Sequence, residues 1–245
     1  MIKIIMDEVI ITSDIHLHPD DNHPINQNFY YFLNTQLTHC SALYLIGDIF
    51  ESWVGDDINL AEYQTVIKLF KKITDDGLPI YLMYGNRDFL MGDDFWQATG
   101  IIKLDDIVEK EINGFKIILA HGDQLCTDDK SYQKMRYLFR NPIIQWLFLK
   151  LPQKKRIKIG EQMRQKSRKH SANKSTNIMD VNSQAVAKLF QQHPHCEHLI
   201  HGHTHQPKHK QVELNAKQKQ IWALGDWRPE AEYIVINDKI TFKTA

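Results

Sequence analysis

The chain has 245 residues, of which 42% are hydrophobic, and its 30 basic residues balance its 30 acidic ones. This length and apolar content are enough for one large core domain with an insertion, and the zero net charge speaks against a nucleic-acid-binding protein. No apolar stretch is long enough to span a bilayer, and no signal-peptide pattern precedes the first predicted strand. Together with three widely separated cysteines, Cys40, Cys126 and Cys196, this predicts a cytoplasmic protein with reduced thiols.

Five short apolar runs predict buried strands, at residues 9–12, 42–46, 79–84, 115–120 and 198–200. Each run is followed by polar residues of the kinds that bind metals: Asp14-Ile15-His16, Gly47-Asp48, Gly85-Asn86-Arg87-Asp88, His121-Gly122-Asp123 and Gly202-His203-Thr204-His205. In open α/β sheets, ligands gather beyond the carboxyl ends of the strands. We therefore expect five strand ends to converge on one polar cluster.

Two apolar stripes at helical spacing predict helices that cover the sheet faces. The first stripe is Phe29, Tyr30, Leu33 and Leu37, and the second is Tyr63, Val66, Ile67, Phe70 and Ile73. After residue 205, short β-rich segments lie around residues 212, 222–224, 233–236 and 240–242 and predict a closing set of strands. The predicted fold class is α/β, an α+β sandwich of two sheets flanked by helices.

Strand patterning stops between Asp128 and Asn177, where the sequence becomes helix-forming and basic. We predict a helical cap at residues 128–177, inserted into a core made of residues 1–127 and 178–245. Its apolar block, residues 142–151, is shorter than the roughly 20 residues of a membrane span. A basic run follows: Lys154, Lys155, Arg156, Lys158, Arg164, Lys166, Arg168 and Lys169. The pairing resembles an interfacial membrane anchor, with a solvated helix face as the alternative; for Trp146 and Phe148 core packing is expected.

Seven residues at the strand ends are candidate metal ligands: Asp14, His16, Asp48, Asn86, His121, His203 and His205. Oxygen and imidazole nitrogen suit Mn, Fe, Co or Zn. Seven ligands exceed what one ion takes from protein while leaving a place for water, so we predict two ions that share a carboxylate. Such a pair, about 3.5–4 Å apart, lowers the pKa of a bridging water and clamps the attacked and leaving oxygens of a phosphoester. Singly, Asp14 could cap a helix and His121 could be a buried histidine; their joint order favours the metal site.

The order D-x-H, G-D, G-N, H-G and G-H-x-H, running from Asp14 to His205, resembles that of the calcineurin-like metallophosphoesterases. The resemblance implies the two-sheet fold, two divalent ions, usually Mn²⁺, and a bridging role for Asp48. It assigns the first ion to Asp14, His16, Asp48 and His205, and the second to Asp48, Asn86, His121 and His203.

Arg87 departs from the pattern of that family, most of whose members carry a histidine after the asparagine. Arginine stays protonated, so it can neutralise phosphate charge but cannot act as a general acid. The leaving group should therefore need no proton, as for a phosphate monoester released from a pyrophosphate, whose second pKa is about 6. The predicted catalytic residues are Asn86, Arg87, Asp48 and His121.

Three motifs are similar to those of the family members that act on the lipid nucleotide UDP-2,3-diacylglucosamine in lipid A synthesis: G-N-R-D-F, C-T-D-D-K at residues 126–130, and S-x-x-I-M-D-V-N at residues 175–182. The resemblance implies attack of water on the α-phosphorus, with UMP and 2,3-diacylglucosamine 1-phosphate as products, by a protein bound peripherally to the cytoplasmic face of the inner membrane. Implied substrate contacts are Asn86, Arg87, Asp129, Ser167, Ser171, Lys174, His203 and His205, although Ser171 stands where that group has asparagine.

Other interpretations remain open at this stage. Another dinuclear-metal phosphodiesterase or pyrophosphatase could act on a soluble nucleotide with the same site, whereas a non-enzymatic scaffold fits poorly with an intact ligand set. Asp129 could simply begin a helix, and Asp123 could orient a ligand imidazole or lie exposed in a turn. The remaining histidines, including His201, are expected at the surface or beside the ligands. Nothing in the chain requires a partner subunit, so we expect a monomer.

Overall fold

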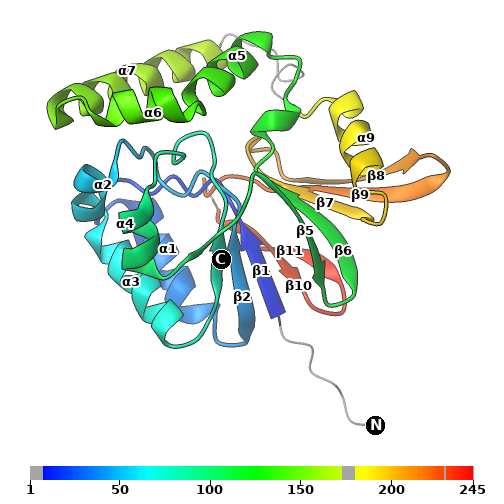
Figure 1. Cartoon of the computed structure of the whole chain (residues 1–245). Helices are drawn as coiled ribbons and strands as arrows, with labels where there is room; N and C mark the ends of the chain where they lie inside the picture. The colour runs from blue at the N-terminus through cyan, green and yellow to red at the C-terminus, as the bar shows by residue number, and fades with distance from the viewer. Residues whose placement is uncertain (1–7, 173–179, 229, 245) are drawn as a thin grey trace.

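The computed structural model describes residues 8–172, 180–228 and 230–244, with the side chains of residues 168–172 excepted, and its centre is a pair of sheets (Figure 1). The first sheet has six strands in the order β11-β10-β1-β2-β3-β4. Their bounds are β1 Glu8–Thr12, β2 Cys40–Leu45, β3 Ile80–Leu82, β4 Ile102–Lys103, β10 Glu232–Ile236 and β11 Ile240–Thr244. Strands β1 to β4 are parallel, so their carboxyl ends meet at one edge.

The second sheet has five strands in the order β5-β6-β7-β9-β8. Their bounds are β5 Ile107–Ile112, β6 Phe115–Ala120, β7 His198–His201, β8 Lys208–Leu214 and β9 Lys217–Ala223. Strands β6, β7 and β9 run parallel, whereas β5 and β8 are antiparallel edge strands. The predicted two-sheet α/β sandwich is confirmed.

Nine helices in the described part of the chain, the short η1 included, complete the fold. They are α1 Pro24–Thr35, α2 Asp56–Glu62, α3 Gln64–Asp75, α4 Asp93–Thr99, η1 Asp123–Leu125, α5 Lys130–Phe139, α6 Pro142–Leu149, α7 Gln153–Ala172 and α9 Ser183–Gln192. Helices α1 to α4 flank the six-stranded sheet and α9 flanks the five-stranded one (Figure 1). Each predicted apolar stripe supplies buried residues to this packing, with Phe29 and Leu33 on α1 and Val66 and Phe70 on α3.

Apolar side chains fill three successive layers, because each central strand buries both faces. The layer beneath α1 and α3 includes Ile10 and Leu43. Between the sheets, Ile11 packs with Leu119 of the facing sheet, and beyond the second sheet Leu199 packs against α9. The five predicted strands are confirmed for this reason. Strands β4 and β5 were not predicted, because Ile102 is exposed and Glu109 and Glu111 interrupt the apolar run of β5.

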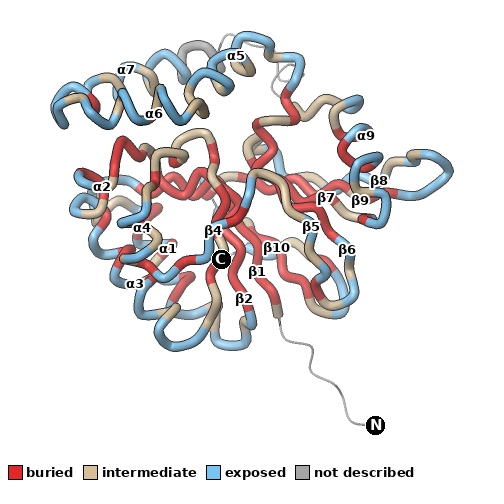
Figure 2. Tube along the Cα trace, viewed as in Figure 1, coloured by how far each residue is buried: buried red, intermediate tan, exposed pale blue. Residues whose placement is uncertain are grey.

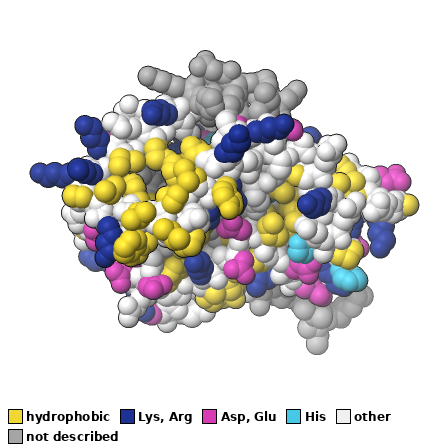
Figure 3. Space-filling view, turned by 45° about the horizontal axis from the view of Figure 1, so that its top comes forward, with side chains coloured by type: hydrophobic (Ala, Val, Ile, Leu, Met, Phe, Trp, Pro, Cys, Tyr) yellow, Lys and Arg dark blue, Asp and Glu magenta, His cyan; other side chains and the backbone are white. Residues whose placement is uncertain are grey.

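Helices α5, α6 and α7 lie above the carboxyl ends of the strands, in the segment expected to form the cap (Figure 1). Figure 2 shows buried residues concentrated in the sheets, while these helices are mostly exposed or half-buried. The expectation of core packing for Trp146 is wrong: Trp146 is 59% exposed, and Ile143 and Leu147 are similarly open, because α6 is almost wholly apolar and no described element covers its outer face. Figure 3 shows an apolar area flanked by basic side chains on one face of the molecule. The predicted end of the cap, residue 177, lies outside the described residues.

No helix in the described ranges is long and apolar enough to cross a membrane. The three cysteines are free, and burial raises the pKa of the Cys126 thiol to about 12 and that of Cys40 to about 11. Thiols with such a pKa are protonated near neutral pH and are poor nucleophiles.

Arg156 does not belong to a solvent-facing cationic surface, which corrects its assignment to the basic run. Only 3% of the residue is exposed. Its Nη1 donates to the backbone oxygen of Val54 at 2.7 Å and to Oδ1 of Asp57 at 2.8 Å, and its Nη2 pairs with the same carboxylate. Because its guanidinium binds Asp57 at the start of α2 and the carbonyl of Val54, Arg156 is buried and attaches α7 to the core. Lys154, Lys155, Lys158 and Lys166 remain exposed.

Replacing Arg156 by methionine is expected to lower the free energy of unfolding by about 1–3 kcal/mol, because charge-assisted hydrogen bonds to Asp57 and Val54 are lost while the stem still packs. Chemical denaturation measures the change. Lys155→Met is the matched control, since it removes an exposed cation from the adjacent position. Equal effects of the two changes would show that Arg156 is not an anchor.

Candidate metal centre

The loops that follow β1, β2, β3, β6 and β7 carry the seven candidate ligands, and contacts between their side chains join the five loops. Asp14, His16, Asp48 and His121 are buried, each with no more than 3% exposure, whereas Asn86, His203 and His205 are partly open. The strands end at a common edge because they are parallel within each sheet. The polar cluster expected at this edge is thus present.

Asp14, His16 and His205 form the first group, whose potential ligand atoms all lie within 4.8 Å of one another. The Nε2 atoms of His16 and His205 are 3.3 Å apart, and His205 Nε2 is 3.2 Å from Asp14 Oδ1. This carboxylate oxygen is buried and makes no hydrogen bond of good geometry within the described structure. A buried oxygen and two imidazole nitrogens that face one another suit a divalent cation, which satisfies all three.

The second group consists of Asp14, Asp48 and His121, again within 4.8 Å. His121 Nε2 lies 3.7 Å from Asp48 Oδ1 and 3.3 Å from Asn86 Oδ1, and the ring of His203 is 5.2 Å away between centroids. The other ring nitrogen, Nδ1, is 2.9 Å from the backbone oxygen of Ile46, so it donates there and leaves Nε2 as a ligand. The expected members of both sites are therefore adjacent, and Asp14 stands closer to the second group than the family assignment implied.

The backbone around the ligands is strained. Five of the seven have a positive φ: Asp14 (53°), His16 (57°), Asp48 (54°), His203 (68°) and His205 (52°). The other non-glycine residues of this kind in the described ranges, Asn113, Asn215 and Ala216, lie in the turns of the β5–β6 and β8–β9 hairpins. A left-handed non-glycine residue costs on the order of 1–3 kcal/mol and persists at functional sites, where surrounding contacts enforce it. The strain is therefore concentrated where the ligands leave their strands.

Glycines before the ligands allow the loops to approach one another closely. A Cβ on Gly85 would lie 2.1 Å from Asp48 Oδ1, and one on Gly202 would lie 2.3 Å from Asp14 Oδ2. Gly47 combines a φ of 96° with a Cβ position 2.5 Å from His121 Nδ1. At each of these positions a side chain would occupy the space of a ligand.

Gly85→Ala is expected to displace Asp48 and to weaken the binding of divalent ions by about 10- to 100-fold, the range found when a ligand loses its positioning. Calorimetric titration of metal-free protein with Mn²⁺ measures the affinity. Gly114→Ala is the control, because nothing lies within 4 Å of its Cβ position and the strain from its φ of 85° is confined to the β5–β6 turn. Wild-type affinity in Gly85→Ala would contradict the close packing against Asp48.

Arg87 lies at the rim of this cluster. Its backbone N–H donates to Asp48 Oδ1 at 2.9 Å, its Nε is 3.4 Å from Asp48 Oδ2, and its Nη1 is 2.6 Å from Glu51 Oε2. The side chain is 24% exposed, so a substrate can reach it. The sequence analysis missed Glu51, although its place three residues after Asp48 could have marked it.

The titration of the imidazoles follows from burial and from the charges around them. Burial and the charge of Arg87 hold the pKa of His16 well below its usual value, and burial and the neighbouring His121 lower the pKa of His203 to about 4. Both rings are therefore neutral near pH 7, as metal ligation requires. Burial works against protonation of His205, but the carboxylates of Asp14 and Asp226 outweigh it and raise the pKa to about 10.

Two carboxylates, Asp123 and Asp226, place negative charge near the candidate ligand rings. Asp123 is buried and accepts from Tyr132 Oη at 2.9 Å and from Arg136 Nε at 2.7 Å, so it is no exposed turn residue. Burial raises the pKa of Asp123, but His121 and Arg136 lower it to about 2, which keeps the charge beside His121. Asp226, which the sequence analysis missed, lies 3.4 Å from His205 Nδ1. A carboxylate at the second ring nitrogen, as Asp226 is for His205, fixes the orientation of a ligand imidazole.

The remaining residues predicted to contact substrate lie outside this cluster or outside the described residues. Asp129 is the N-cap of α5 and accepts from Tyr132 N at 3.1 Å. Ser167 is exposed on α7, whereas the side chain of Ser171 and the whole of Lys174 lie outside the described residues. His201 is buried, with Nδ1 3.0 Å from the backbone oxygen of Gly202, and belongs to neither ligand group of the described residues.

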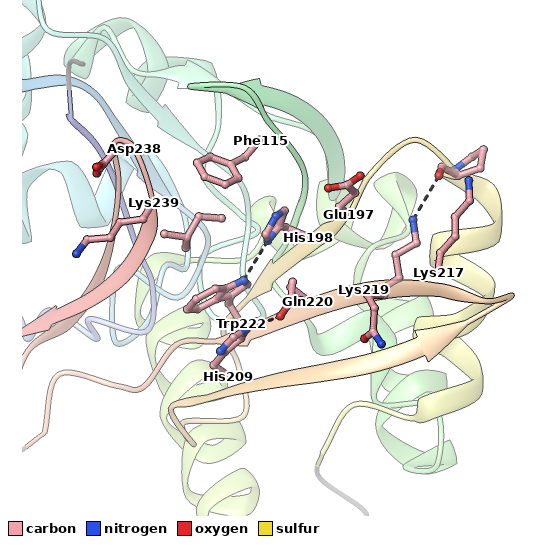
Figure 4. Close-up of a pocket in the computed structure, with 13 residues that line it drawn as sticks. Phe115, Glu197, His198, His209, Lys217, Lys219, Gln220, Trp222, Asp238 and Lys239 are labelled. Carbon is pink, nitrogen blue, oxygen red and sulfur yellow. Dashed lines mark hydrogen bonds between the residues drawn. The ribbon is translucent and has the colours of Figure 1, made fainter. Parts of the chain in front are cut away.

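A separate hollow of about 750 Å³ lies at the opposite ends of the second-sheet strands, lined by Phe115 and His198 where β6 and β7 begin (Figure 4). Trp222 packs there against His209, with ring centroids 3.7 Å apart, and its indole N–H donates to His198 Nδ1 at 3.3 Å. None of the candidate ligands lines this hollow. The candidate metal centre at the carboxyl ends of the strands is therefore separate from this hollow.

The fold and the Asp/His cluster define a metallophosphoesterase, and the chain belongs to the calcineurin-like phosphoesterase family, whose profile it matches over residues 8–207. It is 40% identical to the UDP-2,3-diacylglucosamine hydrolases of Yersinia pseudotuberculosis and Yersinia pestis, over 227 residues that cover 93% of this chain and 94% of each relative. A solved phosphoesterase from E. coli is 13% identical, with 94% of this chain and 88% of that one covered and a TM-score of 0.44, too distant to bear on function.

Proposed function

We propose that this protein hydrolyses the pyrophosphate bond of UDP-2,3-diacylglucosamine to UMP and 2,3-diacylglucosamine 1-phosphate. The observation that carries the proposal is the position of Arg87, which touches the predicted bridging carboxylate of Asp48 at the rim of the ligand cluster. A permanent cation beside an Asp/His site fits a reaction that releases a phosphate and needs no general acid. The relatives at 40% identity carry the name of such a hydrolase.

Two divalent ions held by the seven ligands would supply a water of lowered pKa and positive charge for the phosphate oxygens. We propose Mn²⁺, which oxygen and imidazole ligands accept readily. His205 contacts Asp14, Asn86 and His203 lie beside His121, and Asp14 and Asp48 lie together with His121. We propose Asp48 as the bridge on the family resemblance; by distance, Asp14 is the carboxylate common to the two ligand groups. Arg87 neutralises the phosphate that departs.

In the proposed reaction, the oxygen of water bonds to the α-phosphorus of the UDP moiety, and the bond from that phosphorus to the bridging oxygen breaks. The electron pair leaves with the sugar phosphate, whose second pKa of about 6 makes it stable as a dianion at neutral pH. The proton of the water passes to solvent. Arg87 stabilises the growing negative charge without donating a proton.

The test is hydrolysis by metal-stripped protein with Mn²⁺ added back, in ¹⁸O-labelled water, with mass spectrometry of both products. Label in UMP is the expected result. Label in the lipid phosphate would keep the reaction class but overturn the direction of attack. No turnover of the lipid, with rapid hydrolysis of a soluble nucleotide, would identify another phosphodiesterase or pyrophosphatase.

We further propose that the cap receives the acyl chains and docks on the cytoplasmic face of the inner membrane. The support is the exposed apolar surface of α5 and α6, with Tyr137 82%, Ile143 67% and Trp146 59% exposed, beside exposed lysines at the start of α7. Each buried methylene contributes about 0.8 kcal/mol and each basic residue near an anionic leaflet about 1 kcal/mol, which suits weak and reversible binding.

Sedimentation with phosphatidylglycerol vesicles tests the docking. Trp146→Ser is expected to lower the bound fraction, and Tyr31→Ser is the matched control because Tyr31 is 64% exposed on α1. Equal binding of both variants would contradict the proposed surface. The protein is proposed to act as a monomer.

A further inference from the structure

The loop between β2 and α2, residues 46–55, connects the metal centre with the cap. It contains the bridging candidate Asp48 and also Glu51, which is only 7% exposed. Backbone hydrogen bonds fix it to the neighbouring loops: Glu51 N–H donates to Leu17 O at 2.9 Å, and Trp53 N–H donates to Arg87 O at 2.9 Å. Glu51 is therefore held on a rigid segment beside the site.

The carboxylate of Glu51 binds the guanidinium of Arg87 at a distance of 2.6 Å. The same guanidinium is 3.4 Å from Asp48 through Nε, so it lies between two buried carboxylates. A guanidinium has five N–H donors in a rigid fork. Contacts through Nη1 and Nε fix its plane while other donors of the fork can serve a phosphate oxygen.

Helix α7 of the cap contacts this loop along one face, through residues spaced four apart. Arg156 donates to Val54 O, a Cβ on Gly160 would lie 2.9 Å from Val54 Cγ1, and Arg164 Nη1 is 3.9 Å from Glu51 Oε1. Residues at i, i+4 and i+8 share one side of a helix. The two carboxylate oxygens of Glu51 thus face arginines from different parts of the fold, Arg87 near the ligands and Arg164 on the cap.

We propose that Glu51 is a positioning residue that holds Arg87 at the site of chemistry and couples its placement to the cap through Arg164. The inference rests on the proposed pyrophosphate hydrolysis. Without the charge of Glu51, Asp48 is the one carboxylate among the described residues that still contacts Arg87. The guanidinium is then held through Nε but no longer through Nη1. The cap, which would cover the lipid part of the substrate, and the arginine that meets the leaving phosphate are then no longer aligned.

A double-mutant cycle on the full-length protein tests the role. Glu51→Gln is expected to lower kcat by about 10- to 100-fold, the cost of misplacing a group at the reacting centre, with a much smaller change in KM. In the Arg87→Ala background, the same change is expected to have no further effect on kcat. Arg164→Gln is expected to give a smaller loss, which disappears in the Glu51→Gln background.

Bound metal, measured by mass spectrometry, should remain at the wild-type level in Glu51→Gln, which separates positioning of Arg87 from disruption of Asp48. Glu161→Gln, an exposed carboxylate on the same helix, is the control for charge and should keep the wild-type kcat. Independent, multiplicative losses from Glu51→Gln and Arg87→Ala, or loss of metal, would overturn the proposal. Wild-type turnover of UDP-2,3-diacylglucosamine decides the proposed function separately, and the cycle is run on whichever phosphate ester the wild type hydrolyses.

Discussion

Asp48→Asn is expected to lower turnover by at least about a thousand-fold and to remove both divalent ions, because it neutralises the carboxylate that we propose as the bridge between them. Asp48 is buried, lies 3.7 Å from His121 Nε2 through Oδ1, and accepts the backbone N–H of Arg87. Burial raises the pKa of this carboxyl, whereas His121 and Arg87 favour its charged form. The side-chain amide keeps the shape but loses the negative charge that two cations would share.

Metal analysis of purified protein checks this expectation, together with a thermal melt that shows whether the variant is folded. His205→Ala is the comparison, since His205 contacts Asp14 and His16 on one side of the cluster only. It should mainly lose one ion. If both variants lose the same amount of metal, the assignment of ligands to two ions is wrong.

Arg87→Ala is expected to reduce kcat by about 10²- to 10³-fold, the usual loss when one stabilising donor is removed from a transition state, while metal binding is retained. The reason is that Arg87 contacts the carboxylate of the candidate ligand Asp48 and is not itself a candidate ligand. Arg87→Lys should recover only part of the rate, because a lysine keeps the charge but lacks the planar fork.

Changing the leaving group of the substrate tests the role of Arg87 further. A departing phosphate monoester carries more negative charge than a nitrophenolate, so Arg87→Ala should cost less on the 4-nitrophenyl ester of UMP than on the pyrophosphate substrate. Comparison of kcat for both substrates, in wild type and variant, gives the result. An equal loss on the two esters would mean that Arg87 does not meet the leaving phosphate.

The sequence alone was sufficient to predict the ligand cluster, because its information is local. A buried strand is recognised from its apolar run, a metal ligand from its residue type, and parallel strands bring their carboxyl ends to one edge. Asp14, His121 and His203 were therefore assigned to one centre without knowledge of the packing. Glycines such as Gly85 belong to the same local pattern, although only the geometry shows how close a Cβ there would come to Asp48.

Other features depend on which side chains meet across the fold. Arg156 is indistinguishable in sequence from the lysines around it, and only its burial against Asp57 makes it an anchor. Trp146 lies in a helix with the composition of a core helix, yet within the part of the chain that the structure describes nothing covers it and the ring is exposed.

The sequence by itself determined the two-sheet fold class, the seven candidate ligands and the character of Arg87, since these follow from apolar periodicity and residue chemistry. Only the tertiary structure decided the partners of those residues. Glu51 reaches Arg87 and approaches Arg164, which is 113 positions further along the chain, and Asp226 lies beside His205. The physical reason is that long charged side chains choose partners by burial and distance in space, and neither quantity is contained in local sequence.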